Sequence, residues 1–167
     1  MSLSYQHIKK KIWSNLSEVV DPEIPVINIV ELGVIRNVEI KEGEITITIT
    51  PTYSGCPAME TFEKDIKSKL SQRGFKQIKI ATTFSPAWTT DWLSSETKDK
   101  LKKYGIAPPQ KSLGGKKELF KTESKVVECP FCNSKDTKLV SQFGSTACKA
   151  LHFCNSCSQP FEYFKCI

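Results

Sequence analysis

Hydrophobic side chains recur at spacings of three and four residues in two segments of the N-terminal half, which predicts two amphipathic helices. The first covers residues 5–20 and is expected to end at Asp21-Pro22, because the residue before a proline is disfavoured in helical conformation. The second covers residues 58–73 and ends before Gly74, a residue suited to a left-handed cap. Capping residues predict a third helix over residues 89–104.

Between these helices, hydrophobic and polar residues alternate with a period of two, as in strands that bury one face. Residues 34–40 and 45–50 form two such segments, and the intervening turn predicts a hairpin. Residues 78–84 form a third predicted strand. The order α-β-β-α-β-α predicts the α+β class, with the helices on one face of a small sheet.

The composition changes between residues 108 and 125, where Pro, Gly, Lys and Ser are frequent, as in a linker. We therefore expect one domain over residues 1–107 and a second over residues 126–167. The second has only about forty residues, too few to be held together by hydrophobic burial alone. Its predicted strands are residues 139–143, 147–153 and 160–164.

Cysteine pairs offer the missing constraint in the second domain. Two CxxC motifs are separated by 21 residues and consist of Cys129, Cys132, Cys154 and Cys157. Each motif directs two thiolates to one point, and two motifs supply the four sulfurs that zinc prefers. The sequence therefore predicts a β zinc ribbon. Iron or an iron–sulfur cluster at the same thiolates, or four unrelated buried cysteines, are the alternatives.

Three further cysteines are less constrained. Cys148 and Cys166 are either buried small side chains or a second pair of thiols. Cys56 lies between Gly55 and Pro57 and is expected at the N-cap of the second helix, where the helix dipole favours a thiolate. It is a candidate for transient binding of a metal or cluster. A nucleophile, a redox thiol and a purely structural cysteine remain alternatives.

Acidic residues gather near the end of the first helix. Asp21, Glu23 and Glu31 form a candidate acidic site, although Asp-Pro-Glu is also a common turn sequence. No base is apparent for a catalytic Cys56, because the two histidines are His7, on the first helix, and His152, in the ribbon.

The net charge of +6 has little bearing on function. Most of the excess comes from lysines in residues 61–120, spaced as on a solvated helix face, and Arg36 and Arg73 are the two arginines. This pattern does not favour nucleic-acid binding. No apolar run reaches the ~18 residues of a membrane helix, and the first residues lack the apolar core of a signal peptide. We expect a cytoplasmic protein.

Several motifs resemble the MIP18/DUF59 family of iron–sulfur assembly factors. They are the runs Asp21-Pro22-Glu23-Ile24-Pro25-Val26, Leu32-Gly33-Val34 and Thr50-Pro51-Thr52-Tyr53-Ser54-Gly55-Cys56-Pro57. The resemblance implies an α+β fold similar to cluster-scaffold domains, and it makes Cys56 the functional residue.

A second resemblance covers nearly the whole chain outside the linker. The residues that carry it form four runs: Ser85-Pro86-Ala87-Trp88-Thr89-Thr90-Asp91-Trp92, Tyr104-Gly105-Ile106-Ala107-Pro108-Pro109, Phe143-Gly144-Ser145-Thr146-Ala147-Cys148-Lys149-Ala150-Leu151 and Pro160-Phe161-Glu162-Tyr163-Phe164-Lys165-Cys166. In these runs the chain is similar to a family of accessory components of bacterial phenylacetyl-CoA epoxidase (ring-1,2-epoxidase) complexes.

This second resemblance implies an accessory role in phenylacetate catabolism. The chain would help to mature or repair the iron–sulfur or diiron centres of the oxygenase or reductase component, and it would not itself be the enzyme. The cofactors implied are a structural zinc and transient iron or an iron–sulfur cluster. A structural adaptor for oxygenase subunits, a thiol enzyme built on Cys56, and a homodimer of the first domain are left open.

Overall fold

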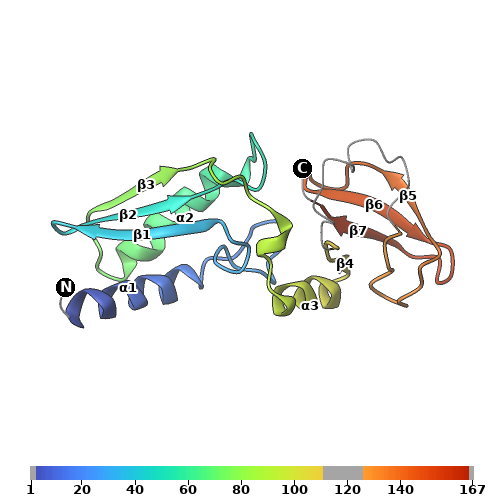
Figure 1. Ribbon diagram of the computed structural model, residues 1–167, viewed down its shortest axis with the longest axis horizontal. Helices are drawn as coiled ribbons and strands as arrows, with labels where there is room; N and C mark the ends of the chain where they lie inside the picture. Colours follow the sequence, from blue (N-terminus) through green and yellow to red (C-terminus); the bar gives the residue numbers. More distant parts are fainter. Residues whose placement is uncertain (1–2, 111–125, 166–167) are drawn as a thin grey trace. The chain divides into compact units, whose positions relative to one another are not determined.

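The computed structural model describes residues 3–110 and 126–165, which divide into two compact units, Met1–Leu93 and Ser94–Ile167 (Figure 1). The α+β class is confirmed. Most of the predicted linker, residues 111–125, lies outside the described residues, as does Cys166. No helix in the described ranges is both long and apolar enough to cross a membrane.

The N-terminal unit contains a three-stranded sheet in the order β1-β2-β3. Its elements are α1 (Leu3–Leu16), β1 (Ile35–Lys41), β2 (Glu44–Ile49), α2 (Ala58–Gln72), β3 (Ile78–Thr82) and a short 3₁₀ turn (Thr90–Trp92). Strands β1 and β2 form the predicted antiparallel hairpin, and Glu42 and Gly43 both have positive φ in its turn. Strand β3 lies parallel to β2, so α2 is the crossover between them.

The core of this unit lies between one face of the sheet and the two helices. Ile45, Ile47 and Ile49 alternate along β2 and are buried, as the period of two predicts. On α2 the buried side chains follow a spacing of four residues: Ala58, Phe62, Ile66 and Leu70. Helix α1 packs against α2 and β1, and α2 also packs against β3 (Figure 1).

The first helix is shorter than predicted. It ends at Leu16, although the hydrophobic spacing continues to Val20. Backbone groups after the helix bond the returning chain instead: Ile29 N–H bonds the Val19 carbonyl at 3.0 Å, and Asp21 N–H bonds the Ile27 carbonyl at 2.9 Å. The Asp21 carboxylate accepts hydrogen bonds from the backbone N–H groups of Glu23 and Ile24, both at 2.8 Å. The chain then turns back, and Val20 pairs with Asn28 in an isolated bridge.

The C-terminal unit contains a four-stranded sheet in the order β4-β7-β6-β5. Its elements are α3 (Ser95–Tyr104), β4 (Ile106–Ala107), β5 (Thr137–Ser141), β6 (Lys149–Cys154) and β7 (Pro160–Phe164). Strand β4 was not predicted. It lies parallel to β7, with Ile106 opposite Glu162 and Ala107 opposite Tyr163. This pairing places α3 and β4 in the C-terminal unit, whereas the sequence placed the boundary after residue 107.

The third helix begins later than predicted. Thr89 caps the 3₁₀ turn rather than a helix, with its hydroxyl accepting from the N–H of Asp91. Ser94 is the N-cap of α3, and its hydroxyl accepts from the N–H of Thr97 at 3.1 Å. The end was predicted correctly, because Gly105 is the left-handed C-cap with φ of 93°.

The turn after α2 provides a test of backbone strain in the N-terminal unit. Gly74 has φ of 90°, and a Cβ there would meet no atom within 4 Å. The N–H groups of Gly74 and Phe75 bond the carbonyls of Ser71 and Leu70, which is the Schellman arrangement. Gly74→Ala should therefore destabilise this unit by about 1 kcal/mol through conformational strain alone.

Urea unfolding followed by tryptophan fluorescence measures this change, since Trp13, Trp88 and Trp92 all belong to the N-terminal unit. Gly74→Asn is the matched control, because Asn tolerates the left-handed region and should cost less than Ala. Equal destabilisation by Ala and Asn would contradict this explanation.

Candidate metal centre and the Cys56 turn

Four thiols meet at one end of the C-terminal sheet. Cys129 and Cys132 precede β5, Cys154 ends β6, and Cys157 lies in the turn that leads to β7. All four sulfur atoms lie within 4.8 Å of one another. The Sγ atoms of Cys129 and Cys157 are 3.7 Å apart, and those of Cys132 and Cys154 are 3.5 Å apart. The two CxxC motifs therefore converge as the sequence predicted.

These distances fit a tetrahedral metal ion. With zinc–sulfur bonds of ~2.3 Å, tetrahedral geometry places the sulfurs ~3.8 Å apart. The two measured separations fall just below this value. Four cysteines without a His or carboxylate form a soft donor set, which suits zinc or iron. The four cysteines form a metal site.

The two CxxC turns, residues 129–134 and 154–159, are called the knuckles here, and they share one pattern of backbone hydrogen bonds. In the first, Cys129 N–H bonds Ser134 C=O at 2.9 Å, and Asn133 N–H bonds Cys129 C=O at 2.9 Å. In the second, the same spacing recurs: Cys154 N–H bonds Gln159 C=O at 3.0 Å, and Ser158 N–H bonds Cys154 C=O at 2.9 Å. Each knuckle is a tight turn that closes on its first cysteine.

Residues with positive φ close both turns. Asn133 and Ser158 have φ of 60° and 58°, each directly after the second cysteine of its motif. A hydrogen bond of 2.7 Å between the hydroxyls of Ser134 and Ser156 joins the two knuckles. These supporting residues were not predicted from the sequence. The signal was a short polar pair after each CxxC, Asn133-Ser134 and Ser158-Gln159.

The thiols of the site differ in acidity. Hydrogen bonding from the backbone N–H of Cys157 is the largest influence on Cys154 and lowers the pKa of its thiol to about 7. Desolvation raises the pKa of the Cys157 thiol to about 12. A metal cation displaces these protons, so protons compete with the metal and its retention should weaken as the pH falls.

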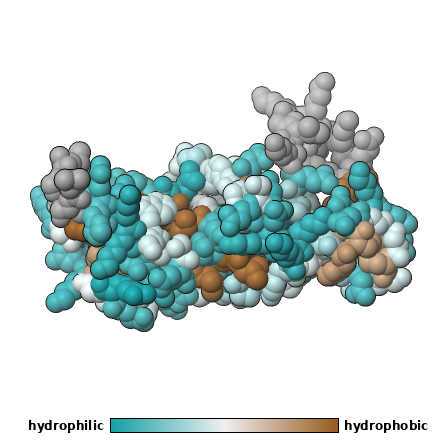
Figure 2. Space-filling view, turned by 90° about the horizontal axis from the view of Figure 1, so that it is seen from below, coloured by the Kyte–Doolittle hydropathy of each residue, from teal (hydrophilic) through white to brown (hydrophobic). Residues whose placement is uncertain are grey.

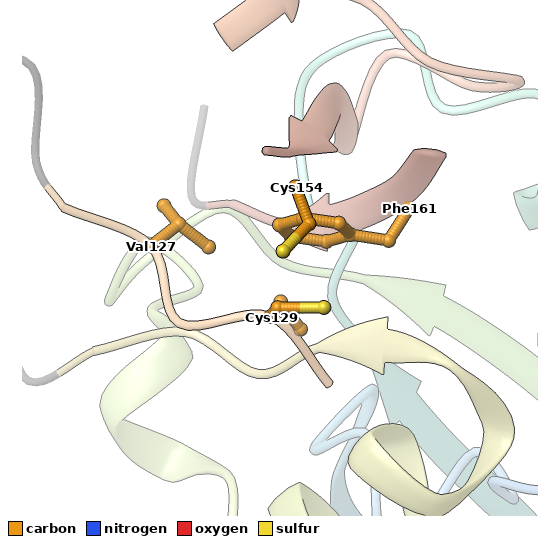
Figure 3. Close-up of a cluster of buried hydrophobic side chains, with 5 residues drawn as sticks. Val127, Cys129, Cys154 and Phe161 are labelled. Carbon is orange, nitrogen blue, oxygen red and sulfur yellow. The ribbon is translucent and has the colours of Figure 1, made fainter. Parts of the chain in front are cut away.

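The site is buried on one side and accessible on the other. Cys129 and Cys154 have no exposed surface, whereas Cys132 is exposed and Cys157 half-buried. Figure 3 shows the side chains of Cys129 and Cys154 beside the ring of Phe161, with Val127 to the left, and these residues belong to one buried cluster. Ala107 of β4 completes this cluster. The metal site is thus part of the hydrophobic core of its unit.

Cys56 lies in the turn between β2 and α2. The sequence placed it at the N-cap of the helix, but Pro57 occupies that position, with φ of −68°, and Cys56 is one residue outside. Its N–H bonds the carbonyl of Tyr53 at 3.3 Å, next to Gly55 with φ of 81°. The thiol is half-buried. Among the described residues, the four ribbon cysteines are the only group of three or more His, Cys, Asp and Glu able to hold a metal, so Cys56 is not part of such a group.

The acidic candidates make local hydrogen bonds. The bonds of the Asp21 carboxylate to Glu23 and Ile24 are those of a turn. The carboxylate of Glu31 accepts from the backbone N–H and the side-chain amide of Asn28 at 3.1 and 2.9 Å. These contacts favour the turn-forming interpretation, and an acidic site remains a prediction.

Cys148 is buried, with its sulfur 3.1 Å from the hydroxyl of Thr146. Because Cys166 lies outside the described residues, a second thiol pair also remains a prediction.

Comparison with known proteins supports both units. Residues 9–76 match the family model described as iron–sulfur cluster assembly protein, and residues 114–165 match the PaaD zinc beta ribbon domain. The chain is 46% identical over 158 residues to an Escherichia coli K12 protein named as a subunit of 1,2-phenylacetyl-CoA epoxidase, covering 94% of this chain and 92% of that protein. The chain belongs to the PaaD family. The resemblance seen in the sequence is confirmed.

The N-terminal part of this PaaD family member also resembles shorter proteins. It is 39% identical over 98 residues to the Fe–S protein maturation auxiliary factor of Porphyromonas gingivalis W83, covering 58% of this chain and 92% of that protein. A DUF59 domain from Bacillus anthracis, solved by crystallography, has 30% identity and a TM-score of 0.54 over 57% of this chain and 92% of the other. These similarities confirm the predicted fold of the first domain.

Replacement of one ligand tests the role of the metal site in folding. Cys129→Ser should lower the bound metal and unfold the C-terminal sheet, because Cys129 is both a ligand and a buried core residue. Hydrogen exchange in residues 126–165 measures the loss, while tryptophan fluorescence of the N-terminal unit should not change.

Cys148→Ala is the matched control for this experiment, since Cys148 is buried in the same unit but is not one of the four clustered thiols. It should retain the metal. If Cys129→Ser kept the metal and its protection from exchange, the four-sulfur site would not hold this unit together.

Proposed function

We propose that the chain is an accessory factor that helps to mature or repair the iron–sulfur or diiron centres of phenylacetyl-CoA epoxidase, and does not catalyse the epoxidation. One observation carries this proposal. A region that matches iron–sulfur cluster assembly proteins and a PaaD zinc beta ribbon lie in one chain, and the whole chain is similar to a protein named as an epoxidase subunit.

The histidine content supports an accessory rather than an oxygenase role. A diiron carboxylate bundle takes a Glu-x-x-His motif from each of two helices. The chain has two histidines, of which His7 lies on α1 and His152 on β6. The sequence also lacks a dinucleotide-binding fingerprint, so a reductase role has no support either.

We assign the transient handling of iron or a cluster to Cys56. It has a half-buried thiol in a tight turn, and the described residues supply no neighbouring group with which it would form a complete metal site. A single thiolate binds a metal weakly and needs further ligands from another molecule. This arrangement suits a cargo that is received and released rather than stored.

The ribbon, in contrast, is assigned a structural zinc. Its four sulfurs lie within 4.8 Å of one another, two of their separations are close to those of a tetrahedral zinc site, and two of the sulfurs belong to the core of the unit. Removing such a metal would disrupt the hydrophobic core of the unit, so the ribbon metal is unsuited to delivery. The partners would be the oxygenase or the reductase component, and the reduced thiols fit a cytoplasmic location.

Metal analysis tests the ribbon assignment. Protein purified without oxygen should contain about one zinc per chain, bound by Cys129, Cys132, Cys154 and Cys157, and should show no visible charge-transfer bands. Elemental analysis and an absorption spectrum measure both properties. Iron in place of zinc, with visible bands, would make the ribbon itself the iron or cluster carrier.

Replacement of Cys56 tests the delivery role. Cys56→Ala should change the stability of the N-terminal unit by no more than about 1 kcal/mol, because the residue is half-buried and lies in a turn outside α2. In a strain that lacks the protein, this variant should fail to restore epoxidase activity during growth on phenylacetate. Ser54→Ala, in the same turn, is the matched control and should restore it.

Two results would contradict the proposed function. Full restoration by a stable Cys56→Ala variant would show that the thiol is only a structural residue. A second experiment adds the chain to purified epoxidase whose metal centres are already filled, which should be active alone. If activity required one chain per complex, the structural adaptor would be the correct function.

A further inference from the structure

The loop between β5 and β6 is held by a buried ion pair. Lys149, at the start of β6, has a side chain that is only 4% exposed, and its Nζ lies 2.9 Å from Oε2 of Glu162 on β7. The other oxygen of Glu162 accepts a hydrogen bond of 2.8 Å from the backbone N–H of Ser145 in the loop. The pair therefore ties the loop to the sheet.

Close packing at Gly144 fixes the same loop. A Cβ at this position would lie 2.8 Å from Oε1 of Glu162 and 3.3 Å from Cβ of Lys149. The N–H of Gly144 bonds the Lys149 carbonyl at 2.6 Å, and the N–H of Lys149 bonds the Thr146 carbonyl at 3.1 Å. A side chain at position 144 would therefore require the Glu162 carboxylate or the loop to shift.

A buried ion pair is not an efficient means of stabilisation. The desolvation of two charges offsets most of their attraction, and apolar replacements are often as stable. Burial also opposes the ionisation of Glu162, but hydrogen bonds from Ser145 and Lys149 outweigh it and lower the pKa of the carboxyl. The pair thus remains charged at neutral pH, and its clearest consequence is a defined loop position.

This fixed loop presents an aromatic side chain to solvent. Phe143 is 64% exposed, and Lys165 Nζ lies 4.6 Å from the centre of its ring. The Lys165 ammonium also donates to the carbonyl of Gln142. Neither contact carries a full negative charge, so the positive charge of Lys165 is not neutralised by them. Hydrophobic atoms are visible on the surface of this unit (Figure 2).

We propose that Phe143 and Lys165 form the docking surface for an acidic protein partner. The ring of Phe143 enters an apolar pocket of the partner, and Lys165 pairs with a carboxylate at the rim of that pocket. The proposal rests on the proposed function, in which the partner is an epoxidase component. Aromatic side chains, Phe included, are enriched at protein interfaces. A loop whose position is already fixed also loses little conformational entropy on binding.

The test measures binding of the full-length chain to the purified oxygenase and reductase components by isothermal titration calorimetry. Phe143→Ser should weaken binding to one component about tenfold or more. Lys165→Glu should weaken it as well, and its effect should diminish in 0.5 M salt, where charge pairing is screened. Gly144→Ala should also weaken binding, because a Cβ there disturbs the Glu162 and Lys149 contacts that position the loop, without removing a contacting side chain.

Two variants serve as controls. Phe84 is 66% exposed and belongs to the N-terminal unit, so Phe84→Ser should bind as the unchanged chain does. Cys56→Ala should also bind with unchanged affinity while failing to support maturation, which separates docking from delivery. Metal content is measured for every variant to confirm that the ribbon is intact.

The outcomes distinguish this proposal from the proposed function. If the unchanged chain bound neither component, the proposed function would fail, and this docking surface with it. If the chain and Phe143→Ser bound equally well, the docking surface alone would be overturned. Light scattering tests whether a second copy of the chain occupies the surface. If the chain formed a dimer and Phe143→Ser dissociated it, the surface would belong to a second copy, and the acidic partner would be overturned. If the chain bound anionic lipid vesicles and Phe143→Ser abolished this binding, the acidic protein partner would likewise be overturned.

Discussion

The convergence of four thiols is the constraint on which the C-terminal unit depends. Its sheet is small, and the hydrophobic cluster beneath it contains Val127, Ala107 and Phe161 together with two of the sulfurs. A unit of this size cannot supply enough apolar burial to offset the entropy lost on folding. Two of the metal ligands therefore act as core residues as well as donors. The first knuckle precedes β5, and the second joins the end of β6 to the start of β7.

The contrast between the ribbon cysteines and Cys56 is one of surroundings rather than of chemistry. Four thiolates around one ion, two of them buried, bind tightly and exchange slowly, which suits a structural metal. A half-buried thiol in a turn that begins a helix has neither property. Under the proposed function, the same side chain serves structure in one unit and transfer in the other, and the number of neighbouring ligands decides between the two roles.

Local periodicity explains which parts of the fold could be predicted. The buried stripe of α2, the β1–β2 hairpin and the convergence of the CxxC motifs follow from spacings of a few residues, and all were predicted correctly. Strand β4 has two residues, too few for any period, and its partner β7 lies more than fifty residues further along the chain. The residues after α1 pair with the returning chain at Ile27 and Ile29, and the Lys149–Glu162 pair depends on strand register. Neither leaves a pattern in the hydrophobic sequence.

The proposed delivery thiol and the proposed docking surface lie on one chain, and under these two proposals this has an energetic consequence. Once Phe143 and Lys165 engage a client, the encounter between Cys56 and that client becomes intramolecular, and its effective concentration is set by the connection between the units. Cys56 then needs no strong affinity of its own. Weak binding by a single thiol is an advantage, because a cargo held by many ligands would not be released. The docking surface supplies the affinity and the specificity, and the Cys56 thiol supplies the exchange.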